Sequence, residues 1–226
     1  AFDQANRLYE QGKFTEAASA YGNLVKAGQS SAALYFNLGN ALLKSGELGP
    51  AILHYRLAQR LAPRDPDIKA NLSFARAAAK SGITGPPRWL AWARALTLNE
   101  LTGAAAIALW ATFTLLTVRQ VWPDKARAWS RLTVSCGTLT LFLALWLSGI
   151  WYQEVGSRPA VVVNKEAVVR LGPFEESQSA FVLHDGAEVK INDIKMDWLQ
   201  IKDAAGRRGW VRHDQIASLN PIGKAQ

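Results

Sequence analysis

Apolar side chains recur along residues 1–80 at the three- and four-residue spacing of amphipathic helices. The stretch 37–63, NLGNALLKSGELGPAILHYRLAQRLAP, holds two such helical patterns with Gly46 between them and Pro63 after the second. Glycine suits the turn that separates two paired helices, and proline ends a helix. The pattern therefore predicts a helix–turn–helix unit.

The helical pattern repeats after 34 residues, which is the period of tetratricopeptide repeats. The aligned pairs are Gly12 with Gly46, Ala17 with Ala51, and Tyr21 with Tyr55. We expect an all-α array over residues 1–80, with two repeats and one capping helix at 66–80. Arrays of this kind normally need about three units to close their cores, so this one is unusually short.

Three asparagines fall at or near the concave face of the array, which is normally the ligand face. They are Asn6, Asn37 and Asn71, each on the first helix of its unit. Their amides can donate to and accept from an extended peptide backbone, which makes them groove-binding candidates. The same amides could equally hydrogen-bond between helices, and the sequence leaves both interpretations open.

One variant of the repeat clamps a C-terminal carboxylate with two asparagines and several basic residues. Asn6 and Asn37 match the two asparagines, but the positions of the basic residues hold Phe2, Asp67 and Asn71. We therefore expect no carboxylate clamp. Lys44 is a candidate for a single charge in the groove, and a solvated lysine is the alternative.

Two uncharged, apolar runs follow at 101–118 and 132–152. About 18 or more apolar residues suffice for a membrane-spanning helix. The tandem runs predict a transmembrane hairpin over 99–152, with helices at about 99–119 and 132–152. The preceding segment 81–98 reads as a linker and a short interfacial helix.

The loop between the two runs is basic, and this sets the expected topology. Its basic residues outnumber its single acid, Asp124, and they are Arg119, Lys125, Arg127 and Arg131. Basic residues in short loops stay in the cytoplasm. We expect a multi-pass protein of the bacterial cytoplasmic membrane, with both soluble domains in the periplasm.

From residue 157 to 220 the pattern becomes that of short strands separated by turns. The order of VRLGP, DGAEV, a tryptophan strand and GWV resembles the bacterial SH3-like (SH3b) domains, and it predicts a small all-β barrel. Trp198 and Trp210 are candidate surface residues for a ligand, although either could belong to the core, and core is favoured for Trp210. The fold class is thus a multi-domain membrane protein with a repeat array, a helical hairpin and a barrel.

The candidate chemistry does not indicate an enzyme. His54, His184 and His213 lie in three separate contexts, so we expect neither a metal site nor a cofactor. The net charge of +8 is diffuse or lies beside the membrane, which does not favour nucleic-acid binding. The single Cys136 lies inside the second apolar run and allows no disulfide framework.

The order of the parts, with the stretches at 37–63, DIKANL and VVVNKEAVVRLGP, resembles the BatE family of the Bacteroides aerotolerance (Bat) operon. The resemblance implies partners with von Willebrand factor A domains and a MoxR-type AAA+ ATPase, and a role in aerotolerance or envelope stress. A membrane-anchored scaffold for protein–protein interactions is our first hypothesis. The alternative is a sensor or adaptor that binds peptidoglycan through the SH3-like domain.

Overall fold

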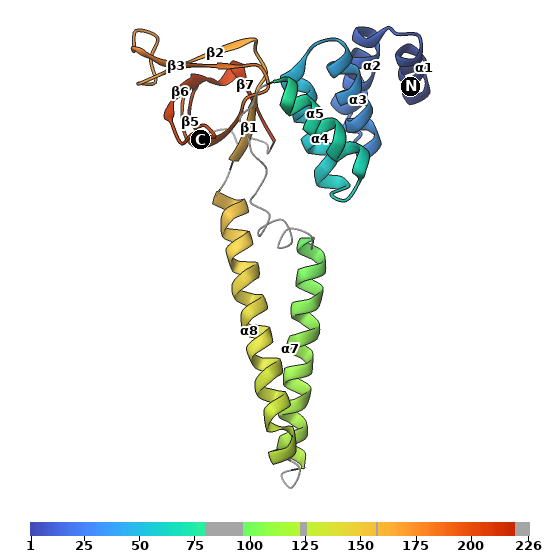
Figure 1. The fold of residues 1–226 in the computed structure, drawn as a ribbon, viewed down its shortest axis with the longest axis vertical. Helices are drawn as coiled ribbons and strands as arrows, with labels where there is room; N and C mark the ends of the chain where they lie inside the picture. The colour runs from blue at the N-terminus through green and yellow to red at the C-terminus, as the bar shows by residue number, and fades with distance from the viewer. Residues whose placement is uncertain (80–96, 123–125, 157, 220–226) are drawn as a thin grey trace. The chain divides into compact units, whose positions relative to one another are not determined.

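The computed structural model describes residues 1–79, 97–122, 126–156 and 158–219 (Figure 1). The described chain forms two compact units. One unit contains five N-terminal helices together with all of the strands, and the other contains two long helices. The predicted fold class is confirmed: a helical repeat-like region, two apolar helices and a C-terminal antiparallel all-β domain.

The repeat region is built from helices that pack on their neighbours in chain order. They are α1 (Phe2–Glu10), α2 (Phe14–Lys26), α3 (Ala32–Lys44), α4 (Leu48–Leu61) and α5 (Pro66–Ala78). The turns after α1 and α3 place Gly12 and Gly46 at φ +76° and +87°, in the left-handed region that favours glycine. This explains why glycine occurs at the same point of both repeats.

Small side chains let the paired helices approach closely. Ala17 and Ala51 are fully buried in the array core, beside the large rings of Tyr21 and Tyr55. A Cβ on Gly39 would lie only 2.8 Å from the ring of Tyr55, so α3 and α4 meet where a side chain is missing. The packing follows from the repeat pattern: each buried tyrosine requires a small residue opposite it.

The C-terminal domain is one antiparallel sheet with the strand order β3-β2-β6-β5-β4-β1-β7. Its strands are β1 (Arg158–Val162), β2 (Glu166–Arg170), β3 (Ser179–His184), β4 (Glu188–Lys195), β5 (Trp198–Lys202), β6 (Arg208–Arg212) and β7 (Ile216–Ser218), with the short helix η2 (His213–Gln215) before β7. Alternate residues of β5, such as Leu199 and Ile201, are buried in a core of their own. This alternation is the period-two pattern that predicted the strands.

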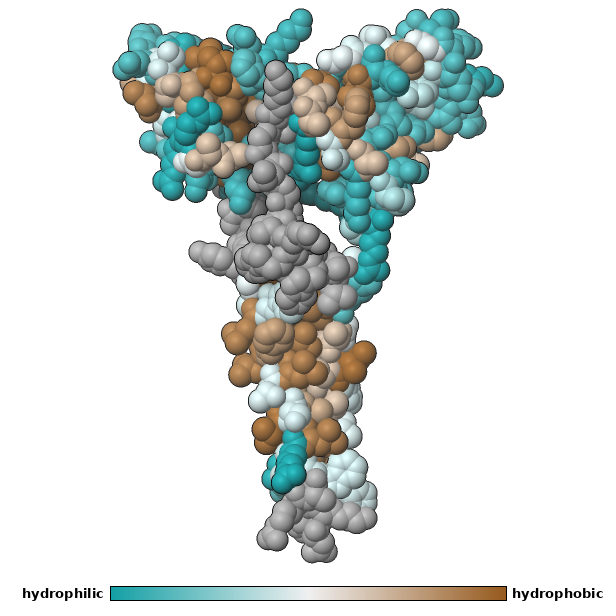
Figure 2. All heavy atoms as spheres, in the orientation of Figure 1, coloured by the Kyte–Doolittle hydropathy of each residue, from teal (hydrophilic) through white to brown (hydrophobic). Residues whose placement is uncertain are grey.

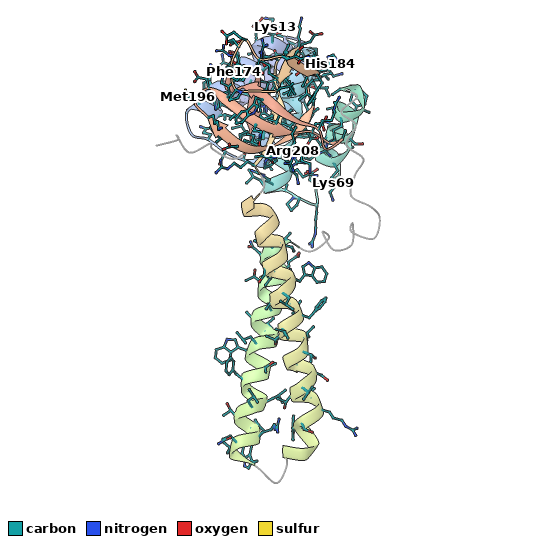
Figure 3. The ribbon with its side chains drawn as sticks, turned by 90° about the vertical axis from the view of Figure 1, so that its left-hand side faces the viewer. Lys13, Lys69, Phe174, His184, Met196 and Arg208 are labelled. Carbon is teal, nitrogen blue, oxygen red and sulfur yellow. The ribbon has the colours of Figure 1, made fainter. Side chains whose placement is uncertain are left out.

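The second unit is a pair of antiparallel helices, α7 (Leu98–Val121) and α8 (Ala126–Gly156). Both are long and apolar enough to cross a membrane, over Leu98–Val121 and Trp129–Ile150. Within the described residues only 11% and 6% of their apolar windows are buried, which is unlike the core helix of a soluble protein. Figure 2 shows hydrophobic residues over the visible face of this pair, and in Figure 3 their side chains project outward.

The barrel packs directly against the repeat array within the first unit. Val161 of β1 and Leu219, which follows β7, belong to the same buried cluster as the array core. At the start of α4, the backbone N–H of Gly49 donates to Asp185 Oδ1 over 2.8 Å. Gly186 lies against Ile52 and Ala79 so closely that a Cβ there would approach both within 2.9 Å. The barrel therefore packs on α4 and on the end of α5.

The predicted linker and interfacial helix at 81–98 lies outside the described residues except for its last two, Thr97 and Leu98. Thr97 caps α7: its hydroxyl accepts from the Glu100 N–H, and the Glu100 carboxylate accepts from the Thr97 N–H over 2.8 Å. This reciprocal cap pairs two backbone donors at the start of the helix, which begins at Leu98.

Candidate functional site

The two buried tyrosines of the array hydrogen-bond to asparagines on the first helix of each repeat. The hydroxyl of Tyr21 donates to Asn6 Oδ1 over 2.5 Å, and Asn37 Nδ2 donates to the same oxygen over 3.4 Å. One acceptor thus joins α1, α2 and α3. Burial raises the pKa of the Tyr21 phenol, which keeps it protonated as a donor.

The same arrangement recurs one repeat later. Tyr55 donates to Asn40 Oδ1 over 2.7 Å, and Asn71 Nδ2 donates to that oxygen over 2.8 Å. Burial raises the pKa of the Tyr55 phenol well above its ordinary value, with smaller effects from Tyr9 and Asn71. We call these two sets of hydrogen bonds the asparagine ladder. Each rung ties together three successive helices.

A cavity of about 200 Å³ opens beside the first rung and is lined by residues of α1, α2 and α3. Its lining residues are Asn6, Tyr9, Glu10, Tyr21, Asn37 and Asn40. Two of the predicted groove asparagines, Asn6 and Asn37, therefore lie in the cavity wall. They also hydrogen-bond to one another between α1 and α3. Binding of a peptide by these amides remains a prediction.

Asn40 is a lining residue that the sequence reasoning missed. Asn40 lies 34 residues after Asn6, so the repeat period could have identified it as the equivalent position in the second repeat. Asn71 is placed in the second rung and not in the cavity wall. Lys44 is exposed at the end of α3, where it is the repeat equivalent of Glu10.

The two candidate tryptophans of the barrel lie on its outer face. Trp210 pairs with Gln200 on β5, while the alternate residues Leu199 and Val211 point into the barrel core. Trp210 is only 7% exposed, and the ammonium of Lys195 lies 5.4 Å from its ring centroid. It is therefore buried, as the sequence favoured, although strand register places it on the face opposite Leu199 and Val211. Trp198 is half-buried on the same face.

Exposed apolar residues of the barrel lie in two of its turns, one between β2 and β3 and one between β4 and β5. Leu171 is 62% exposed and Phe174 is 53% exposed, and Met196 in the β4–β5 turn is 94% exposed. Figure 3 labels Phe174 and Met196 at the surface of this unit. The turn between β2 and β3 is tied to the sheet by Glu175, which pairs with Arg212 over 2.6 Å.

The helical hairpin has a seam of small and hydroxylated residues. Thr112 of α7 and Thr140 of α8 lie 3.2 Å apart through their hydroxyls, and Gly137 faces the methyl group of Thr112. The Thr112 hydroxyl also donates to the Ala108 carbonyl. Small residues and satisfied hydroxyls are what close packing of two membrane helices requires.

The residues predicted to set the topology are only partly described. Arg119 is half-buried near the end of α7, and Arg131 is exposed near the start of α8. Lys125 and the side chain of Arg127 lie outside the described part of the chain. The cytoplasmic placement of this loop remains a prediction.

The profile described as Tetratricopeptide repeat matches residues 2–66, and the profile described as Bacterial SH3 domain matches residues 163–217. The chain is therefore a modular protein with a tetratricopeptide repeat region and a bacterial SH3 domain, joined in sequence through two apolar helices. Comparison with curated proteins gives no match. Both kinds of domain are typically non-catalytic binding modules.

Proposed function

We propose that this protein is a membrane-anchored, non-enzymatic scaffold whose repeat cavity binds a segment of a partner protein. The cavity at the first rung carries the proposal, because it combines amide donors and acceptors with aromatic walls. Such groups suit an extended backbone and its side chains. The partner would then be held at the membrane by the α7–α8 hairpin.

The contact between barrel and array is compatible with a hairpin that spans the membrane. Two spanning helices return the chain to the side on which it started, so both soluble domains would share one aqueous compartment. Arg76 of α5 and Glu188 of β4 form an ion pair, which requires such a shared compartment. By the distribution of basic residues in the loop, that compartment is the periplasm.

The resemblance to the BatE family extends the proposal to partners. A Bat-type complex would supply von Willebrand factor A-domain proteins in the same membrane, together with a MoxR-type ATPase. Holding two binding modules on one membrane anchor raises their effective concentration toward a shared assembly. The role in aerotolerance or envelope stress rests on this resemblance.

Site-specific photo-crosslinking in native membranes tests the scaffold. A photoreactive residue at Tyr9, in the cavity wall, is expected to yield an adduct with a discrete membrane-associated protein. The same residue at Asn23, exposed on α2 and outside the cavity wall, is the control. Absence of a Tyr9-specific adduct across growth conditions would count against the scaffold.

Peptidoglycan binding by the barrel is a second candidate, favoured by the exposed Phe174 and Met196 on its surface. Apolar and aromatic side chains at a surface can stack on sugar rings. The full chain in detergent should then co-sediment with purified sacculi, and Phe174→Ser should weaken retention. A chain that stays in the supernatant would exclude this function.

A further inference from the structure

The cavity at the first rung has an acidic and aromatic wall. Among its six described lining residues Glu10 is the one acid, and the other five are asparagines and tyrosines with no basic side chain. Glu10 forms no ion pair with any described residue. A carboxylate without a cationic partner beside aromatic rings is a suitable environment for an incoming cation.

The hydrogen bonds of the first rung leave a defined set of groups for a ligand. Asn6 uses Oδ1 as the acceptor for Tyr21 and Asn37, and Asn37 uses Nδ2 as the donor. Among the described residues this leaves the Asn37 oxygen as an acceptor and the Asn6 NH₂ as a donor. The oxygen suits a cationic N–H group, and the NH₂ group suits a peptide carbonyl.

The size of the cavity fits a side chain and not a single ion. Its volume is about 200 Å³, whereas one water needs only about 10–15 Å³ of comparable space. The ring of Tyr9 lines the wall and is held by an edge contact with Phe14 at 5.2 Å between centroids. Aromatic walls pack well along the methylene stem of a lysine or arginine.

The second rung lacks this chemistry, although it repeats the same hydrogen bonds. The 34-residue shift replaces Glu10 by Lys44 and Tyr9 by Leu43. A basic and an aliphatic residue thus stand where the first repeat offers a carboxylate and a ring. Of the two rungs, the first therefore offers a carboxylate beside an aromatic ring and the second does not.

We propose that the cavity formed by α1, α2 and α3 takes the lysine or arginine side chain of an extended peptide segment. Glu10 pairs with the charge, Tyr9 packs on the methylene stem, and the free amide groups of the first rung bind the peptide backbone. This deepens the proposed function, on which it rests. A cavity that binds a cation through Glu10 is opposite in charge to a site for a C-terminal carboxylate.

A random peptide library displayed against the purified full chain in detergent tests this inference. The selected peptides should be enriched in lysine or arginine at one position. Glu10→Gln should abolish that enrichment and lower the affinity of a selected basic peptide by about fivefold. Glu16→Gln, an exposed acid on the first turn of α2, is the matched control and should leave both unchanged.

The outcomes separate the inference from the proposed function. Selection of neutral or acidic peptides that bind Glu10→Gln equally well would overturn the cation site while leaving the scaffold in place. Failure to select any peptide would count against peptide binding by the array and so against both. Glu10→Lys adds a further check, because the preference should change toward acidic peptides.

Discussion

Glu188 at the start of β4 and Arg76 of α5 form a two-point ion pair, in which Nε and Nη2 of the guanidinium face the two carboxylate oxygens. Arg56 of α4 reaches the same carboxylate over 3.2 Å. The Glu188 side chain is only 8% exposed, so these contacts are largely shielded from water. The barrel and the repeat array are joined by this carboxylate as well as by their shared apolar cluster.

Replacing Glu188 by glutamine should destabilise the unit formed by array and barrel. The amide keeps the size of the side chain but removes the charge between two guanidinium groups, at an expected cost of about 1–3 kcal/mol. Thermal unfolding of the full chain in detergent, followed by circular dichroism, measures the change. Glu166→Gln, on an exposed position of β2, is the control, and equal effects of the two changes would contradict the ion-pair role.

The start of α4 offers a steric test of the same contact. A Cβ on Gly49 would lie 2.1 Å from the Val162 carbonyl oxygen and 2.2 Å from Asp185 Oδ1, so Gly49→Ala must push the barrel from the array. We expect a loss of about 1–3 kcal/mol in unfolding free energy. Gly22→Ala on α2 has no atom within 4 Å and should instead be neutral, or stabilising by up to about 1 kcal/mol. A neutral Gly49→Ala would mean that the two domains do not pack as described.

Asp185 gives this contact a pH dependence. Burial raises the pKa of its carboxyl, and hydrogen bonds from Gly49 and Leu48 oppose this shift only in part. The folded state therefore holds the proton more tightly than the unfolded state, and stability falls as pH rises from about 4 through the raised pKa. Asp185→Asn keeps the acceptor oxygen but cannot ionise.

The stability of Asp185→Asn relative to the native chain should consequently increase as pH rises across that window. Below the window the two proteins should unfold at similar temperatures. Thermal unfolding of both chains over a pH series measures this difference. A difference that stays constant with pH would contradict the raised pKa.

Much of the fold could be predicted from the sequence, because its signals are local. The 34-residue period identified the helices, and short alternating runs such as that of β5 identified the strands. The contact between Arg76 and Glu188 could not be predicted from the sequence. The two residues lie 112 positions apart in the chain, before and after the apolar segments. No local pattern marks one charged residue among many as the partner of another.

For the candidate site, too, the sequence predicted the positions of residues on the helices but not their contacts. Asn6 and Asn37 could be placed on the concave side from the repeat, and both line the cavity. That one oxygen of Asn6 accepts from both Tyr21 and Asn37 depends on the packing of three helices. The burial of Trp210 on the outer face depends likewise on strand register, which pairs it with Gln200.

The asparagine ladder makes a prediction about stability. Tyr55→Phe removes a hydroxyl from a fully buried ring and leaves Asn40 Oδ1 with one donor, Asn71. The expected cost is about 1 kcal/mol of unfolding free energy. Tyr35→Phe is the control, because among the described residues the Tyr35 hydroxyl makes no hydrogen bond. Similar midpoints of thermal unfolding for the two variants would show that the asparagine ladder contributes little to stability.

The most direct test of the membrane-anchored scaffold is accessibility to a membrane-impermeant maleimide in intact spheroplasts. Single cysteines replace Ser19 on α2, Asn192 on β4 and Arg131 on α8, all exposed, in a Cys136→Ser background. We predict that the cysteines at 19 and 192 are labelled from outside, and that the one at 131 is labelled only after lysis. Labelling of 19 and 192 from opposite sides, or of 131 from outside, would contradict the account.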